Sequence, residues 1–248
     1  MPEELGSFIE NLDNILEENY GDFKIFSGKW KFPSSKKNKL FISIAWSGWG
    51  KVSAARATTR LITKPVNKKI DLLIFTGVAG SANPFLNQWD VLIPDKLIQH
   101  DMDASPLFEK YEIPALKKKF LSPSDLWIAW AQSTIEKAIL NKKISRFNKV
   151  LTGMIATGDK FISSNNTLEK LSNSLPGLYA VEMEGAAFAQ VACQEKISWL
   201  VIRVISDNAD DLAAQNFNQF LSEYKFESNK LLKVMIENYE NAPWELNN

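Results

Sequence analysis

Near-continuous apolar runs alternate along this chain with segments whose apolar residues have helical spacing. Residues 71–77 (DLLIFTG) and 197–206 (ISWLVIRVIS) are the clearest of these runs. Runs that are apolar at consecutive positions are typical of strands buried on both faces of a sheet, and helices usually cover such sheets. We therefore expect the α/β class, with a single three-layer domain built on a central mixed, mostly parallel sheet flanked by helices.

The rest of the sequence divides into further strands and helices in the same alternating order. Pro94 interrupts one strand, a serine precedes the helix at 122–139, and residues 100–122 form a connection of a length that is often functional. Neither internal repeats nor a low-complexity linker divide the chain, so we expect residues 1–248 to form one domain. The spacing predicts helices over 5–18, 53–62, 122–139, 165–172, 184–196 and 217–239, and further strands over 39–46, 89–99 and 150–158.

The composition excludes several classes of function. The 29 basic residues balance 29 acidic ones, so nothing favours nucleic acid or an anionic membrane as a partner. A single cysteine, Cys193, excludes an internal disulfide and a cysteine-rich zinc site. His100 is the lone histidine, so we expect a hydrogen-bonded structural residue and no metal site. No apolar run approaches the roughly 18 residues of a membrane span and no signal-peptide pattern is present, so we expect a cytoplasmic protein. We also expect the protein to need no cofactor.

Two stretches near the C-terminus place charged residues in apolar surroundings. YAVEMEGAAFA (179–189) carries Glu182 and Glu184 where an extended segment gives way to a helix, and WLVIRVISDNAD (199–210) ends a strand at Asp207. A buried, unpaired carboxylate is costly, so it usually takes up a proton, finds a partner or binds a ligand. Ligands of α/β proteins bind at the carboxyl ends of strands, so this pattern predicts an enzyme.

Each charged residue also has an architectural interpretation. Glu184 could simply place a favourable charge at the start of a helix. Arg203, inside an apolar strand, must pair with a carboxylate, and Glu182 and Glu4 are the candidates. Asp207 could cap the turn that follows its strand.

The glycine-rich segments do not form a phosphate loop. SGWGKVS (47–53) has the wrong glycine spacing for a Walker loop and lacks a hydroxyl residue after its lysine. TGVAGSA (76–82) lacks the dinucleotide fingerprint, although it follows a buried strand. Its glycines either let a ligand approach the backbone or form a tight turn.

Four segments in this order and spacing resemble one superfamily. They are TGVAG (76–80), ATGDKFI (156–162), VEMEGAA (181–187) and RVISDNAD (203–210). Together they resemble the nucleoside phosphorylase superfamily and, within it, the 5′-methylthioadenosine/S-adenosylhomocysteine nucleosidases. The resemblance covers residues 1 to about 240 and implies a nucleoside phosphorylase-like fold. It also implies hydrolysis of the N-glycosidic bond of 5′-modified adenosines, with release of adenine.

The resemblance assigns roles at the leaving base and the sugar. Asp207 would protonate the purine ring at N7, for which burial must raise its proton affinity. Glu184 would bind the ribose hydroxyls, and Met183 would pack under the sugar. Phe161 would stack on the adenine, while the backbone of Ile162 would read its edge.

The resemblance also assigns the nucleophile and its surroundings. Gly80 would lie in a turn that faces the ribose and the attacking water. Phosphorylases of the superfamily hold phosphate with arginines and a hydroxyl in this turn, whereas this chain has Val78 there and no adjoining arginine. An apolar valine offers no hydrogen-bond donor to an anion, which favours water as the nucleophile.

The 5′ end of the substrate would be covered by Phe217 and the loop at 104–114. In relatives this loop comes partly from the neighbouring subunit, so the resemblance implies a homodimer. A departure from the pattern is Trp49, where relatives tend to have a smaller aliphatic residue, and it would reshape the 5′ pocket. The loop residues expected to take part are Leu107, Phe108 and Pro114.

A second departure concerns the N-terminus. The family usually opens with an apolar strand that ends in Ala-Met-x-x-Glu, and Met1–Glu4 match the end of that motif, with Glu4 as the general base. The strand itself is absent from this sequence. We therefore expect either that translation starts further upstream, so that the first strand is missing here, or that this protein completes its sheet in a different way. Two alternatives stay open: a hydrolase of futalosine-type nucleosides and a catalytically weak nucleoside-binding homologue.

Overall fold

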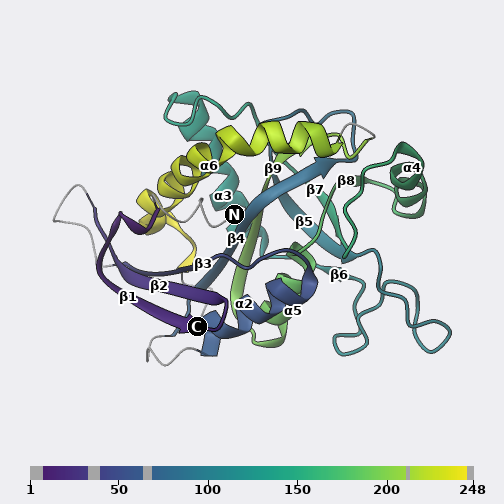
Figure 1. The fold of residues 1–248 in the computed structure, drawn as a ribbon, viewed down its shortest axis with the longest axis horizontal. Coiled ribbons are helices and arrows are strands. Elements are labelled where there is room, and N and C mark those ends of the chain that lie inside the picture. The colour runs from purple at the N-terminus through teal and green to yellow at the C-terminus, as the bar shows by residue number, and fades with distance from the viewer. Residues whose placement is uncertain (1–7, 33–39, 64–68, 211–212, 245–248) are drawn as a thin grey trace.

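The computed structural model describes residues 8–32, 40–63, 69–210 and 213–244 (Figure 1). Its strands are β1 (Leu12–Tyr20), β2 (Phe23–Trp30), β3 (Phe41–Ala45), β4 (Leu72–Ser81), β5 (Val91–Gln99), β6 (Phe120–Leu121), β7 (Val150–Thr157), β8 (Leu178–Glu182) and β9 (Ser198–Asp207). Its helices are α2 (Lys51–Thr63), α3 (Asp125–Leu140), α4 (Asn165–Ser174), α5 (Gly185–Gln194) and α6 (Ala213–Glu237), followed by a 3-10 turn, η1 (Tyr239–Asn241).

The larger sheet has the order β6-β5-β7-β8-β4-β9, and a further pairing between β5 and β9 closes it. The β4–β9, β5–β7 and β7–β8 pairs are parallel, whereas β4–β8, β5–β6 and β5–β9 are antiparallel. The expected α/β class and mixed sheet are confirmed, but the sheet is a closed, barrel-like one and is not strictly mostly parallel. The register of β5 shifts between Pro94 and Lys96, and such a bulge bends a strand. The segment of β5 before this bulge pairs with β9, while the whole strand pairs with β7.

The smaller sheet consists of β1, β2 and β3 in antiparallel order, so the predicted helix over 5–18 is wrong for residues 12–18. The apolar residues Ile15 and Leu16 suggested helical spacing, but both are about half exposed and pack no helix face against a core. Gly21, with φ of 70°, instead allows the chain to reverse, so that Tyr20 pairs with Phe23. The strand β2 was missed, although Phe23, Ile25 and Ser27 alternate as its buried face.

Helices cover both faces of the larger sheet. Figure 1 shows α6 on one side of β4 and β9, with α2 and α5 on the other side. On the α6 side the core contains Trp127 of α3 and Leu231 of α6 packed on β5 and β9. On the opposite side Phe188 and Ala189 of α5 pack on β4, β5 and β9. The sheet is therefore buried on both faces, as the apolar runs predicted.

Most other predicted elements are confirmed within a few residues. Ser124 lies at the N-terminal boundary of α3 in an extended conformation, but its side chain makes no capping hydrogen bond. The long connection after β5 contains only the short β6 and one isolated bridge, Ile113 to Lys118. Within the described ranges, no helix combines the length and apolarity needed to cross a membrane.

Candidate active site

A cavity lies at the carboxyl ends of β4 and β9, where Gly80 pairs with Asp207. Its wall is completed by four further segments: the turn before α2, residues 160–162, the start of α6 and the junction of β8 with α5. Nine of the residues predicted from the sequence line this cavity together: Trp49, Val78, Gly80, Phe161, Ile162, Met183, Glu184, Asp207 and Phe217.

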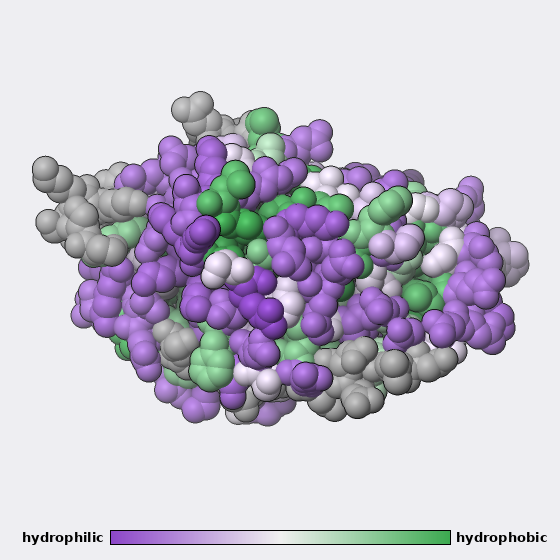
Figure 2. Space-filling model, turned by 90° about the horizontal axis from the view of Figure 1, so that it is seen from above, coloured by the Kyte–Doolittle hydropathy of each residue, from purple (hydrophilic) through white to green (hydrophobic). Residues whose placement is uncertain are grey.

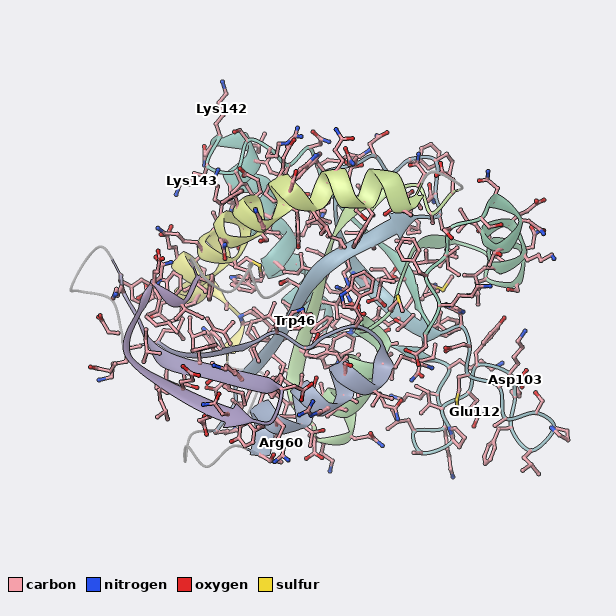
Figure 3. All side chains as sticks on the ribbon, in the orientation of Figure 1. Trp46, Arg60, Asp103, Glu112, Lys142 and Lys143 are labelled. Atoms are coloured by element: carbon pink, nitrogen blue, oxygen red, sulfur yellow. The ribbon has the colours of Figure 1, made fainter. Side chains whose placement is uncertain are left out.

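Three of the predicted site residues, all from the loop at 104–114, are not brought there. Phe108 is 41% exposed and Leu107 is 84% exposed, and neither lines the cavity of this chain. Pro114 does not line it either. In Figure 3 Asp103 and Glu112 mark a loop that projects to one side, whereas Trp46, which lines the cavity, lies near the middle of the view. Glu4, the predicted general base, lies outside the described residues.

The buried ion pair of Arg203 with Glu182 forms the floor of the cavity. Both side chains are almost fully buried, and the Arg203 guanidinium donates to the Glu182 carboxylate. Glu182 also accepts hydrogen bonds from the hydroxyl of Thr157 and from the backbone N–H groups of Glu184 and Gly185, the last two at 3.0 and 2.8 Å. The predicted pairing of Arg203 with Glu182 is confirmed. Glu182 is fully occupied within the protein and acts as a structural residue.

Glu184 is engaged differently, although it lies only two residues away. Its Oε1 accepts from the Gly50 N–H at 2.8 Å, and its Oε2 lies 3.3 Å from Arg203. Burial raises the pKa of the Glu184 carboxyl, while the Arg203 charge opposes this shift. Glu184 is the N-cap residue of α5, so its charge does lie at the start of a helix, but its side chain makes no capping hydrogen bond there. With 15% of its side chain exposed, Glu184 can still accept hydrogen bonds from a ligand.

A network of carboxylates fixes the turn that carries Trp49. Asp159 accepts from the Lys51 N–H at 2.8 Å, and Asp101 accepts from the Asp159 N–H at 2.9 Å. The Lys51 ammonium closes the network by pairing with Asp101 at 2.6 Å. The network ties the start of α2 to the segment that carries Phe161. Asp159 stands within the ATGDKFI segment, but no role was predicted from the sequence for it or for Asp101.

Aromatic rings form one wall of the cavity. The Phe217 ring meets Trp49 and Phe161 edge-on, with ring centroids 5.8 Å apart in both pairs. Trp49 is 52% exposed and Phe161 36% exposed, whereas Ile162 is buried. Exposed aromatic faces beside a cavity offer stacking surfaces to a planar ligand.

Asp207 is the last residue of β9 and is 6% exposed. The Ser206 hydroxyl donates to its Oδ2 at 2.6 Å, and the Ala209 N–H donates to its Oδ1 at 2.8 Å. Burial raises the pKa of this carboxyl, although both hydrogen bonds work against the shift. Asp207 does cap the following turn, as the architectural interpretation supposed, and it also faces the cavity.

The TGVAG segment lies within β4 and does not form the predicted turn. A Cβ on Gly80 would lie 2.9 Å from Asp207 Oδ1, and a Cβ on Gly77 would collide with the Arg203 guanidinium. These glycines therefore make room for charged protein side chains. Val78 lines the cavity, and the one arginine among its described lining residues is already paired with two carboxylates.

His100 does not line the cavity. Its Nε2 atom is buried without a hydrogen-bond partner among the described residues and lies against Gly158. Burial lowers the pKa of the imidazole. The expected structural location is therefore right, but the expected hydrogen bond is missing at Nε2.

Comparisons with known proteins identify the relatives of this chain. A sequence model of the family described as "Phosphorylase superfamily" matches residues 1–237. A 5′-methylthioadenosine/S-adenosylhomocysteine nucleosidase of Buchnera aphidicola is 31% identical over 239 residues, which cover 95% of this chain and 92% of that protein. The crystal structure of such a nucleosidase from Colwellia psychrerythraea in complex with adenine has a TM-score of 0.82 and 29% identity, covering 96% and 91% of the two chains. Futalosine hydrolase of Helicobacter pylori has a TM-score of 0.80 and 30% identity, covering 96% and 94%.

Proposed function

We propose that this chain, which belongs to the phosphorylase superfamily, hydrolyses the N-glycosidic bond of 5′-modified adenosines such as methylthioadenosine and S-adenosylhomocysteine. Adenine is the base released. The nucleosidase relatives and the adenine complex support this activity. The observation that carries the proposal is the buried Asp207 carboxyl, which shares one cavity with Glu184 and an aromatic wall.

Asp207 is the proposed general acid. Cleavage of the glycosidic bond passes through a ribosyl cation and leaves negative charge on the purine, so a proton delivered to N7 stabilises the departing base. Burial raises the pKa of Asp207, so a larger fraction of this carboxyl keeps its proton as the pH approaches neutrality. Ser206 and Ala209 hold both carboxyl oxygens in place.

Glu184 is the proposed ligand of the ribose hydroxyls. Gly50 fixes one of its oxygens before any substrate arrives, which limits the reorganisation that binding requires. Its negative charge also favours the cationic sugar of the transition state. Met183 would pack under the sugar, Phe161 would stack on the adenine, and the Ile162 backbone would read the adenine edge.

Water is the proposed nucleophile. The Arg203 charge is paired with Glu182 and Glu184, and Val78 offers no donor, so Lys160 is the one further cation of the described lining that could attract a phosphate ion. Gly80 lies beside Asp207 in the same cavity, where the reacting sugar would sit. Activation of the water by Glu4 stays a prediction from the sequence.

The 5′ substituent would contact Trp49 and Phe217. A homodimer would bring the exposed loop residues Leu107 and Phe108 of a second subunit to this end of the cavity, and their exposure supports that arrangement. The homodimer and a cytoplasmic location stay predictions.

A futalosine-type nucleoside is the second candidate substrate, because futalosine hydrolase matches this chain as well as several nucleosidases do. The test is to incubate the purified protein with methylthioadenosine, S-adenosylhomocysteine, futalosine and adenosine, and to identify the released base and sugar. Adenine from the first two at the highest kcat/KM supports the proposal. Preferential release of hypoxanthine from futalosine would replace the substrate, and binding of a transition-state analogue without turnover would leave only the nucleoside-binding alternative.

A further inference from the structure

His100 follows the last residue of β5, and its imidazole packs against the segment that follows β7. Polar side chains normally lie at the surface, as on the mostly hydrophilic face of the molecule in Figure 2. The Nε2 atom of His100 is buried instead, and it has no hydrogen-bond partner among the described residues. A buried polar atom without a partner is rare in folded proteins, so this one requires an explanation.

The His100 ring contacts Gly158 so closely that no side chain fits between them. A Cβ on Gly158 would collide with the ring at Nε2 and Cε1. Backbone hydrogen bonds fix both partners of this contact. The His100 N–H donates to the Thr157 carbonyl at 2.9 Å, and the Gly158 N–H donates to the Glu182 carbonyl at 3.1 Å. The imidazole is therefore held against the peptide that leads out of β7.

Gly158 begins a segment that contributes to the active-site wall. Phe161 and Ile162 belong to this segment, and both line the cavity. Residues 158–162 are therefore named the base segment, after the adenine that Phe161 and Ile162 would contact. Any shift of Gly158 would be passed along these few residues to the cavity.

The neighbour of His100 holds the same segment by a hydrogen bond. Asp101 accepts from the Asp159 N–H at 2.9 Å and pairs with the Lys51 ammonium at 2.6 Å. Asp159 in turn accepts from the Lys51 N–H. His100 and Asp101 thus support the start of the base segment together, one by contact and the other by a hydrogen bond.

The charged groups that face His100 come from separate elements. Burial lowers the pKa of the imidazole and has the largest effect, and Lys51 at the start of α2 acts in the same direction. Asp101 after β5 and Glu182 at the end of β8 favour a proton on the ring. The carboxylate of Asp159, in the base segment, is directed to the Lys51 N–H. Because its pKa is lowered, the ring is neutral at neutral pH.

Protonation of His100 would disturb the base segment in two ways. It would place a positive charge and an N–H donor on Nε2, where no described group accepts a hydrogen bond. The charge would also attract the Asp101 carboxylate, which holds the Asp159 N–H in the neutral state. A buried charge without a close partner is costly, so the base segment would have to move to admit water.

We propose that His100 is a positioning residue: its neutral imidazole holds the base segment in place for purine binding, and its protonation loosens that segment and weakens binding. The proposal rests on the proposed function, because it takes adenine as the group that Phe161 and Ile162 contact. His100 does not line the cavity, so it acts through Gly158. This effect of acid on affinity is separate from the protonation of Asp207.

The chain has one histidine, so the imidazole C2–H resonance of the untagged protein reports His100 alone. Its NMR titration is recorded with and without saturating adenine. The coupling between ligand and proton binding is reciprocal, so adenine should lower the midpoint of this titration if it favours the neutral ring. The affinity for adenine, measured by calorimetry, should correspondingly fall by up to about tenfold for each pH unit below the midpoint.

His100→Phe keeps a ring against Gly158 but cannot take up a proton. We expect its affinity for adenine at neutral pH to lie within a few fold of that of the unaltered protein, and the decline in acid to be absent. If His100→Phe does not fold, His100→Gln provides the same comparison, because an amide does not titrate either. Comparing variant and unaltered protein at each pH also cancels the protonation of adenine itself.

Amide hydrogen exchange of residues 158–162, read by mass spectrometry without any ligand, tests the link between His100 and the base segment directly. After correction for the intrinsic pH dependence of exchange, protection should fall across the His100 midpoint in the unaltered protein and stay constant in the variant. An adenine complex with an unchanged midpoint, or an equal decline of affinity in the variant, would overturn the proposal. Failure of adenine to bind at any pH would instead count against the proposed function. Unchanged protection across the midpoint would overturn the positioning role by itself.

Discussion

The substitution Asp207→Asn separates the proposed proton donor from the structural role of the same residue. In the protein, Ala209 donates to Asp207 Oδ1 and Ser206 donates to Oδ2. An asparagine oxygen still accepts from Ala209, and its NH₂ group can donate to the Ser206 oxygen. The Ser206 hydroxyl can then donate to the Ala79 carbonyl, which already lies 3.3 Å away. Both contacts survive, so we expect the free energy of unfolding to change by no more than about 1 kcal/mol.

The effect on catalysis should be much larger, because an amide cannot donate a proton to the departing purine. General acid catalysis contributes about 10²- to 10⁴-fold, which corresponds to about 3–5 kcal/mol of transition-state stabilisation. The assay follows adenine release from methylthioadenosine and compares kcat with the affinity for a substrate analogue. The affinity should change little, since the stacking and ribose contacts remain. Adenine release within a few fold of the unaltered rate would refute the role of Asp207.

The pH dependence of the rate and of the stability provides a second test of Asp207. Burial raises the pKa of Asp207 above its ordinary value. The protonated form is therefore favoured in the folded state, and its contribution to stability is present below the ordinary aspartate pKa and lost as the pH rises through the raised pKa. The rate should fall over the same upper range as the donor loses its proton. Asp207→Asn should lack this decline in rate, and its stability relative to the unaltered protein should rise with pH.

Three further predictions test other parts of the site. Glu182→Gln leaves the buried Arg203 charge poorly compensated, so the free energy of unfolding measured in urea should fall by about 3 kcal/mol. An unchanged free energy of unfolding would contradict the structural role of Glu182. Asp159→Ala removes the acceptor of the Lys51 N–H, so KM for methylthioadenosine should rise several fold with little change in Tm. Glu169→Ala on α4 is the matched control. Equal KM values for the two variants would count against the network. Added phosphate should not accelerate turnover, and detection of a 5-substituted ribose-1-phosphate by mass spectrometry would show that phosphate can replace water.

The sequence allowed good prediction wherever burial is reflected in local composition. The runs that became β4 and β9 are apolar at consecutive positions because helices cover both faces, and Asp207 at the end of β9 stood out against that background. The hairpin of β1 and β2 was not predicted, because β1 is mostly exposed and its pairing with β2 supplies the order that its own residues do not signal.

The division of labour between Glu182 and Glu184 was also beyond the sequence. Both glutamates stand in the same apolar stretch, and only their partners distinguish them. Glu182 meets Thr157 and Arg203, which come from β7 and β9, while Glu184 meets the turn before α2. These contacts join segments that are distant along the chain, so no local pattern records them. The TGVAG glycines were misread for the same reason, because their neighbours come from β9.

The closure of the larger sheet has a consequence for how the active site forms. Gly80 and Asp207 lie about half the chain apart, and they meet only when β9 pairs with β4 and β5. Such long-range pairing is late and slow in folding, because the loop-closure entropy must be overcome first. The nascent chain is therefore inactive until the segment beyond residue 207 has been synthesised and docked. Recovery of adenine release during refolding would report the final closure of the sheet rather than the earlier formation of helices.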